Sequence, residues 1–425
     1  MLLTACGLAA AIRIAWASAV RSVPVSDFAY YVDKAAGLAS GRGYTTGGVP
    51  TAFWPPGYPI FLAGVFRVLG DSHTVIIGTS IVLWTVTTAL VYLLGLRLDG
   101  RATAAIAAFT VALFPEFILF ANLASSENLF IPLVLVSILV LSPKQKMSGP
   151  PDWKRSLLAG LLLGFAVVVR TTAILMPPLM ALVLLLWYRS RPAFISACLL
   201  IAAFAISPAA WMVRNTVTMG SPVLSTNGGI SLWQGNNPLA TGGYRLKAST
   251  PPKDTSTPAK EVAANSEYTK AAITFVLTQP GQFIALVPAK AKQLFAKPAT
   301  LGWNTAVNVR GAASSYSERP LTPAEKRAVA VVVALRGNQA IWMKVLWLVG
   351  LAGLAIALIQ RRAVGVWIGA VVGYWLLFHV TLGNGQPRYL VSVAPEVAIC
   401  AAFLAVAVAR WGSGLIGLST ARRRR

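Results

Sequence analysis

Two carboxylates and three arginines of this chain stand beside long apolar runs. Asp27 and Glu127 precede apolar segments, and Arg170, Arg214 and Arg388 interrupt or border them. A carboxylate can take a proton from a hydroxyl group, and the planar guanidinium of arginine fits the oxygens of a phosphate group. These residue types therefore suit proton transfer next to a phosphate-bearing substrate.

The sequence around Asp27, "SDFAYYVDKAAGLASGRGY", predicts a short helix over 27–40 that Ser26 caps and Gly41 stops. Asp27 falls in its first turn, where the helix dipole favours a negative charge. A turn rich in proline and glycine follows, and then a second apolar helix that is too short to span a bilayer. Together they predict an aromatic-lined pocket at the membrane surface with a carboxylate inside. The predicted substrate-pocket residues are Tyr30, Tyr31, Lys34, Trp54, Tyr58 and Tyr389.

The elements that must position these residues are membrane spans. Hydrophobic residues make up 56% of the chain and charged residues only 12%, whereas about a quarter of a soluble domain is charged. A helix of about 20 apolar residues crosses a bilayer. The predicted fold is an all-α polytopic membrane protein with about ten transmembrane helices and a small external domain. The predicted spans are 2–20, 74–96, 102–120, 128–142, 156–169, 173–188, 193–212, 341–359, 363–381 and 389–409.

The net charge of +24 comes from short basic clusters between the apolar runs. With ten spans, these clusters all fall on one side, which the positive-inside rule assigns to the cytoplasm. Nucleic-acid binding is disfavoured because no basic stripe or recognition module is present. The clusters are Lys144/Lys146/Lys154/Arg155, Arg189/Arg191, Arg361/Arg362 and Arg422 to Arg425.

Two regions have alternative interpretations. The stretch 156–188 is too long for one span, and basic clusters flank both of its ends, so the chain is expected to turn back near Arg170. The first segment resembles a signal peptide in length, but it lacks a basic start and Arg13 interrupts its apolar core. A retained anchor is therefore preferred over a cleaved signal.

The topology divides the chain into three parts. A transmembrane module, 1–213, contains the first external loop at 21–73, which carries the candidate catalytic acid. An external domain follows at 214–340, and the last helices and a basic cytoplasmic tail occupy 341–425. The external domain contains apolar residues at helical spacing on both sides of Pro280-Gly281. This pattern predicts a broken amphipathic helix near the membrane surface.

An ordered set of motifs carries a family resemblance. "SDFAYYVDKAAGLASGRGY" is followed by "PTAFWPPGYPIFLAG", "FPEFILFANLASSENLF" and "GLLLGFAVVVRTTAILMPP". Further on come "WMVRNTVTMGSPVLSTNGGISLWQGNNPLATGGY" and "GQPRYLVSVAPEV". The set covers most of the chain and resembles the GT-C superfamily of integral-membrane glycosyltransferases. More narrowly, it resembles the protein mannosyltransferase and aminoarabinose transferase group.

The resemblance implies transfer of a hexosyl or pentosyl group from a polyprenyl-phosphate sugar, with inversion at the anomeric carbon. Asp27 matches the family's first-loop acid and would be the base; the alternative is an aspartate that only caps a helix. Glu127 matches the acid of the second external loop; the alternative is a capping role at the next helix. Asp33 suits a solvated helix position or a substrate contact, and Glu116 is a weaker candidate for a site role.

The donor phosphate would be bound by Arg170, Arg214 and Arg388, which stand on the side without the basic clusters. The alternatives for each are anchoring to lipid headgroups or pairing with an acid. The aminoarabinose branch has an acid and a lysine just before the proline pair, where this chain has Phe53 and Trp54. That departure puts a metal and a lysine–phosphate contact in doubt.

No obligatory cofactor or metal is expected. The two histidines, His73 and His379, lack ligand spacing, and the cysteines Cys6, Cys198 and Cys400 lie in apolar segments. The expected partners are a polyprenyl-phosphate-linked sugar donor, the lipid bilayer and a lipid, glycan or protein acceptor. The expected location is the plasma (inner) membrane, with the site on the external face. The competing functions are a polytopic transporter and a non-catalytic lipid-binding protein of the cell envelope.

Overall fold

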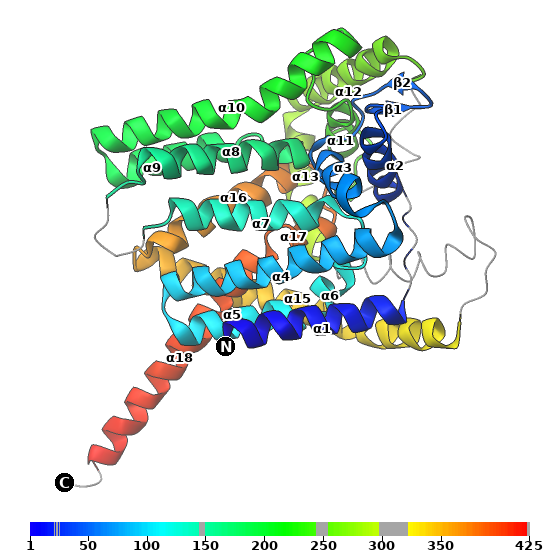
Figure 1. Ribbon diagram of the computed structural model, residues 1–425. Helices are drawn as coiled ribbons and strands as arrows, with labels where there is room; N and C mark the ends of the chain where they lie inside the picture. The colour runs from blue at the N-terminus through cyan, green and yellow to red at the C-terminus, as the bar shows by residue number, and fades with distance from the viewer. Residues whose placement is uncertain are drawn as a thin grey trace.

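Long helices lying side by side form the body of the protein (Figure 1). The structure is a computed structural model that describes residues 1–20, 22, 24, 26–143, 149–243, 254–296 and 322–422. The long helices are α1 (Leu2–Ala19), α4 (His73–Leu98), α5 (Arg101–Leu113), α7 (Ser126–Leu141), α8 (Trp153–Val169), α9 (Met176–Tyr188), α10 (Arg191–Met219), α15 (Pro323–Ile359), α16 (Ala363–Thr381) and α18 (Ala394–Arg422).

The remaining elements gather mainly at one end of this bundle, on the right of Figure 1. Three of them are breaks in or between long helices: α6 (Pro115–Phe120), the 3₁₀ turn η1 (Thr171–Ala173) and α17 (Arg388–Val391). The others are α2 (Asp27–Ala39), β1 (Thr45–Thr46), β2 (Val49–Pro50), α3 (Gly57–Leu69), α11 (Asn227–Gly235), α12 (Pro258–Thr278) and α13 (Pro280–Ala296). Helix α1 begins and helix α18 ends at the opposite end of the bundle, as the ten-span topology predicts.

The predicted all-α membrane fold is confirmed, and each of the ten predicted spans is largely helical. Four of them are short, because α5 and α9 have 13 residues each, α7 has 16 and α8 has 17. Pro115 ends the first of these early, since proline cannot continue the hydrogen bonding of a helix. In the described part of the chain, seven helical stretches are long and apolar enough to cross a membrane: 2–19, 73–98, 171–188, 191–219, 341–359, 363–381 and 394–412.

The predicted hairpin at Arg170 is confirmed. Helix α8 ends at Val169, and Arg170 itself has an extended backbone with φ −142° and ψ 101°. Helix α9 then returns toward the end of the bundle at which α8 begins (Figure 1). The chain therefore crosses twice between its two basic clusters, and Arg170 lies at the turn.

Helices α8 and α10 approach each other closely because α8 carries glycines four residues apart. A Cβ atom at Gly160 would lie 2.3 Å from the carbonyl oxygen of Leu200, and one at Gly164 would lie 2.4 Å from that of Phe204. Small residues at this spacing let helix backbones pack directly in a membrane. This contact fixes the position of α8 along its axis relative to α10, and hence the position of Arg170 at its end.

The first external loop forms the predicted pair of short helices. Helix α2 begins at Asp27, but the Ser26 side chain makes no capping hydrogen bond and its φ is +53°. The helix ends as predicted: Gly41 has a φ of +81°, and the amide of Arg42 donates to the carbonyl of Gly37 at 2.9 Å. The two-stranded β1–β2 hairpin then leads to the 13-residue helix α3.

The predicted external domain contains the expected broken helix. Helices α12 and α13 meet at Gln279–Pro280 with a bend of 105°. The expected limits at 213/214 and 340/341 fall inside α10 and α15, because both helices continue past the apolar run that identified them. Arg214 therefore lies on a helix and not in a loop.

The sidedness of this bundle leads to a labelling prediction. In a background without the native cysteines, a cysteine at Asp71 should react with an impermeant thiol reagent that is added outside the cell. Asp71 is exposed and lies in the loop 21–73, which is expected on the external side. A cysteine at the exposed Arg189, in a basic cluster, should react only after the membrane is permeabilised. The reverse pattern would contradict the predicted orientation.

Candidate active site

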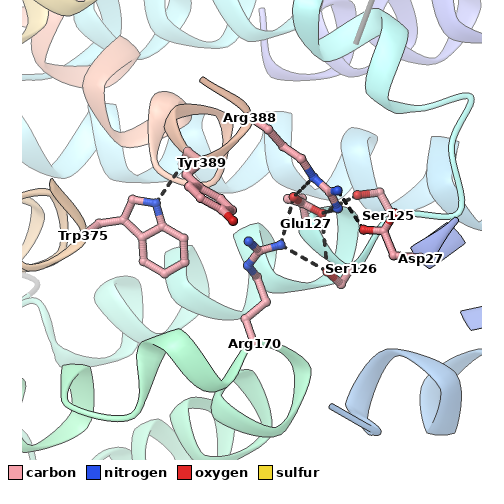
Figure 2. A network of polar contacts seen from close by, with 8 residues as sticks. All are labelled: Asp27, Ser125, Ser126, Glu127, Arg170, Trp375, Arg388 and Tyr389. Atoms are coloured by element: carbon pink, nitrogen blue, oxygen red, sulfur yellow. Dashed lines mark hydrogen bonds and ion pairs between the residues drawn. The ribbon is translucent and has the colours of Figure 1, made fainter. Parts of the chain in front are cut away.

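A cluster of two carboxylates and two guanidinium groups lies at the end of the bundle that holds α2 and α17 (Figure 2). Nη1 of Arg388 lies 2.7 Å from Oδ2 of Asp27. Nε and Nη2 of the same side chain donate to the two carboxylate oxygens of Glu127, at 2.7 and 3.2 Å. Arg388 therefore joins the two predicted catalytic acids, which stand 100 residues apart in the sequence.

Glu127 is the centre of the cluster. Its side chain is fully buried, and Nη1 of Arg170 lies 2.8 Å from its Oε1. The hydroxyl of Ser125 donates to Oε2, and that of Ser126 does so at 3.3 Å. Nη1 of Arg170 also donates to the Ser126 hydroxyl at 3.2 Å, which fixes the arginine against the start of α7.

Each of the four side chains lies at or next to the end of a helix. Asp27 is the first residue of α2, and Glu127 lies in the first turn of α7. Arg170 follows α8, and Arg388 opens α17 after Pro387. Arg388 precedes the predicted span 389–409, whose first residues form α17 as a separate four-residue helix, followed by a break before α18.

The cluster is electrically balanced and nearly dry. Its side chains are exposed by 0% for Glu127, 10% for Arg170, 12% for Asp27 and 16% for Arg388. Burial opposes ionisation of Glu127, which precedes the predicted span, but the charges of Arg170 and Arg388 outweigh it and hold the pKa of this carboxyl below its usual range. Glu127 is therefore a fixed anion that holds the two arginines, whereas Asp27 has Arg388 as its one ion-pair partner among the described residues.

Aromatic rings enclose the two guanidinium groups. Cζ of Arg388 lies 5.0 Å from the ring centre of Phe28, and that of Arg170 lies 5.7 Å from Trp375 and 6.0 Å from Tyr389. Nε1 of Trp375 donates to the backbone carbonyl of Tyr389 at 2.7 Å. Rings at these distances stabilise the cations and exclude water, so the predicted pocket residue Tyr389 lies beside the cluster.

The first loop adds an aromatic group beside Asp27. Tyr31 is buried and meets Trp54 and Tyr58 edge to face, with ring centres 6.2 and 5.6 Å apart. Burial, and then the nearby charge of Asp27, raise the pKa of the Tyr31 phenol. Three of the predicted pocket residues thus lie together, and Tyr31 stays protonated next to the candidate base.

Two other predicted pocket residues have contacts within the loop. Nζ of Lys34 lies 2.7 Å from the exposed carboxylate of Asp33, donates to the Thr45 carbonyl at 2.6 Å and lies 4.5 Å from the ring centre of Tyr30. The Lys34 side chain is buried by these contacts. They tie α2 to the β1–β2 hairpin and do not include the arginine–carboxylate cluster.

Arg214 is also engaged elsewhere. Its guanidinium donates to the carbonyls of Thr51 and Tyr44, both at 2.9 Å, and lies 4.8 Å from the ring centre of Trp211. These bonds hold the first loop on α10. Its role as a phosphate ligand stays a prediction. In the structure, Arg214 stabilises the backbone of the first loop.

Sequence reasoning missed several residues that build the site. Glu261 of α12 is buried and accepts from the amide of Ala52 at 2.9 Å and the hydroxyl of Thr51 at 2.8 Å, so it anchors the loop before the proline pair. The paired serines of "SSEN" could have been recognised as polar groups placed to serve a buried acid. The sequence does not single out Trp375 as a site residue, because it stands among apolar residues of a predicted span. Glu116, the weaker candidate that the sequence does name, is buried in the first turn of α6.

Potential metal ligands do not gather into a larger cluster among the described residues. Among them, no group of three or more histidine, cysteine, aspartate or glutamate side chains could hold a metal ion. His73 begins α4, and His379 stacks on Tyr389 with ring centres 4.0 Å apart. The two acids of the cluster are instead neutralised by arginines.

Comparisons with known proteins agree with the fold. Residues 54–211 match the family model described as dolichyl-phosphate-mannose-protein mannosyltransferase. The crystal structure of the oligosaccharyltransferase of Archaeoglobus fulgidus, in complex with zinc and sulfate, aligns with 96% of this chain at a TM-score of 0.50 and 14% identity. The resemblance to GT-C glycosyltransferases is confirmed. The family segment contains Glu127 and Arg170, while Asp27 and Arg388 lie outside it.

The alignment has limits that bear on function. The chain spans about half the length of the archaeal oligosaccharyltransferase, since 49% of that protein is covered. ArnT of Cupriavidus metallidurans, solved with undecaprenyl phosphate bound, aligns at a TM-score of 0.42 and 12% identity, over 93% of this chain and 76% of that one. No curated protein matches the chain. At these identities the likeness to solved structures shows the fold alone.

The cluster leads to a stability prediction. Glu127→Gln removes the buried anion between Arg170 and Arg388 and leaves one carboxylate for two guanidinium groups. Breaking a buried ion pair on one side typically costs about 3–5 kcal/mol, so the purified variant should show a clearly lower thermal midpoint in detergent. Asp71→Asn, at an exposed acid after α3, is the matched control and should leave the midpoint unchanged. Equal midpoints for both variants would contradict the central role of Glu127.

Proposed function

We propose that this protein transfers a sugar from a polyprenyl-phosphate donor to an acceptor on the external face of the plasma (inner) membrane, with inversion at the anomeric carbon. The observation that carries the proposal is the convergence of Asp27, Glu127, Arg170 and Arg388 on one buried cluster. Such a transfer needs a base for the acceptor and cations for the departing phosphate. The cluster holds both within a single hydrogen-bonded network.

Asp27 acts as the base. It lies at an element start beside the buried ring of Tyr31, and it shares Arg388 with Glu127 instead of being enclosed by two arginines. The Asp27 carboxylate takes the proton of the acceptor group while the acceptor atom forms its bond to the anomeric carbon. The bond between that carbon and the phosphate oxygen breaks on the opposite face, and its electron pair leaves with the polyprenyl phosphate.

Arg388 and Arg170 bind the departing phosphate. Arginine binds phosphate through two parallel donors, and these two side chains are oriented by Glu127 and by the surrounding rings. A phosphate oxygen can replace Asp27 at Nη1 of Arg388. This exchange leaves the Asp27 carboxylate to the acceptor, while Glu127 keeps both arginines in place.

The donor class has support from the family segment. The matching family model is described by its use of dolichyl-phosphate mannose, a polyprenyl-phosphate sugar. A hexosyl or pentosyl group on such a lipid presents its phosphate at the membrane surface, and the cluster lies at one end of the bundle, where such a surface is expected. The acceptor is a lipid, a glycan or a protein that reaches the same surface.

A turnover assay tests the proposal. Purified protein in detergent or liposomes is supplied with a radiolabelled polyprenyl-phosphate sugar and a membrane extract as the source of acceptor. We expect transfer of the label to a product and release of polyprenyl phosphate. Donor binding without release would favour a lipid-binding protein, and movement of intact donor across liposomes would favour a transporter.

Loss of the base gives the sharpest mutational prediction. Asp27→Asn should lower turnover by about 10² to 10⁴-fold, the usual contribution of a general base, while membrane insertion and donor binding stay close to those of the parent protein. Asp33→Asn, on the same helix, is the control and should keep nearly full turnover. Parental activity in Asp27→Asn would exclude Asp27 as the base.

The phosphate site gives a second mutational prediction. Arg388→Lys and Arg170→Lys keep the charge but lose the two-donor geometry, so each should reduce turnover by on the order of 10²-fold, as when one transition-state donor is removed. Arg67→Lys, at an exposed arginine of α3 that donates to the Leu38 carbonyl, should be nearly silent. Kinetics of purified variants at saturating donor distinguish these outcomes, and a fully active Arg388→Lys would rule out this phosphate site.

A further inference from the structure

The loop that carries Arg388 is held by a buried lysine outside the cluster. Lys290 of α13 has 0% exposure. Its Nζ donates to Oδ1 of Asn236 at 2.8 Å and to the backbone carbonyl of Thr381, the last residue of α16. Among the described residues, Lys290 has no carboxylate partner. An ammonium group buried without an anion is costly, so its position calls for a compensating contact.

The end of α16 supplies that contact. The last carbonyls of a helix have no partner within the helix, and they carry the negative end of its dipole. Lys290 satisfies one of these carbonyls. Asn236 satisfies the next one, because its Nδ2 donates to Leu382 at 2.7 Å. We call Asn236 and Lys290 the loop clamp.

The loop is fixed at a further point before it reaches Arg388. The amide of Gly385 donates to the carbonyl of Gly242 at 2.7 Å. Gly385 also passes so close to α13 that a Cβ atom there would lie 2.2 Å from the Lys290 carbonyl oxygen. Only two residues, Gln386 and Pro387, lie between Gly385 and Arg388, so the backbone of α13 and the loop clamp determine the position of the guanidinium group.

We propose that Lys290 is a positioning residue that sets the placement of Arg388, and that it acts through Asn236 and the backbone at 381–385. The chemical consequence rests on the proposed function, because Arg388 matters for turnover only if it binds the donor phosphate. The geometric consequence does not depend on it. A misplacement of about 1 Å at a reacting group can cost about 10²-fold in rate, so loss of the clamp lowers turnover without removing any group that touches substrate.

The test joins a structural and a kinetic measurement on the full chain. Lys290→Met removes the ammonium group and keeps most of the apolar stem. Lys292→Met, at an exposed lysine one half-turn further on α13, is the matched control. Backbone hydrogen exchange of 382–391 should rise in Lys290→Met and stay at the parental level in Lys292→Met. Unchanged exchange in Lys290→Met would overturn the inference, whatever the activity of the protein.

A double-mutant cycle separates positioning from general destabilisation. Lys290→Met should lower turnover strongly in the parent protein but by less than about 2-fold in the Arg388→Lys background, because residues that act through one another are not additive. Equal losses in both backgrounds would overturn the inference. If Lys290→Met does not fold, Asn236→Ala removes the bond to Leu382 and takes its place in both measurements. If exchange rises as expected but even the parent protein shows no turnover, the proposed function fails and the positioning role stands.

Discussion

Four ionised side chains meet in a nearly dry place, and this constrains much of the remaining structure. Glu127 is fully buried and would be costly without Arg170 and Arg388, so the ends of α7, α8 and α17 must lie at one height. Asp27 adds the start of α2 to the same level. The short helices, the tight contact between α8 and α10 and the break before α18 are consistent with this requirement, because each sets where a helix ends.

Five of the described arginines fall into two groups according to what they bind. Arg13 donates to the carbonyls of Val111 and Ala112 near the end of α5, and Arg155 donates to those of Val140 and Ser142 at the end of α7. Such arginines satisfy helix ends that lack internal partners, and Arg214 behaves in the same way in the first loop. Arg170 and Arg388 instead bind carboxylates, and a phosphate can replace a carboxylate as a ligand far more readily than it can replace a backbone carbonyl. The sequence places these residues within or near the ends of predicted spans and cannot separate the two groups.

Local features were predictable because their causes are local. Apolar run length located the helices, Gly41 stopped α2, Pro280 broke the external helix, and the charges around 156–188 placed the turn at Arg170. Long-range partners were not predictable, because no spacing rule links Glu261 to Ala52 or Lys290 to Thr381. The broken helix had been interpreted as a surface element from its mixed composition. Lys290 is nevertheless buried, because the helix packs on α16 and on the loop that follows it.

Helices α12 and α13 each bind a loop next to the site, and their sequence does not indicate this. Glu127 and Arg170 come from the ends of the bundle helices α7 and α8, whereas Asp27 follows the first span in a loop and Arg388 opens the short helix α17 after a loop. Glu261 of α12 anchors the first loop at Ala52, and Lys290 of α13 anchors the loop before Arg388. The 105° bend allows one continuous segment to reach both loops. Asp27 and Arg388, the proposed base and phosphate ligand, are therefore held at their separation by the same bent segment, and a change in its bend would move one relative to the other.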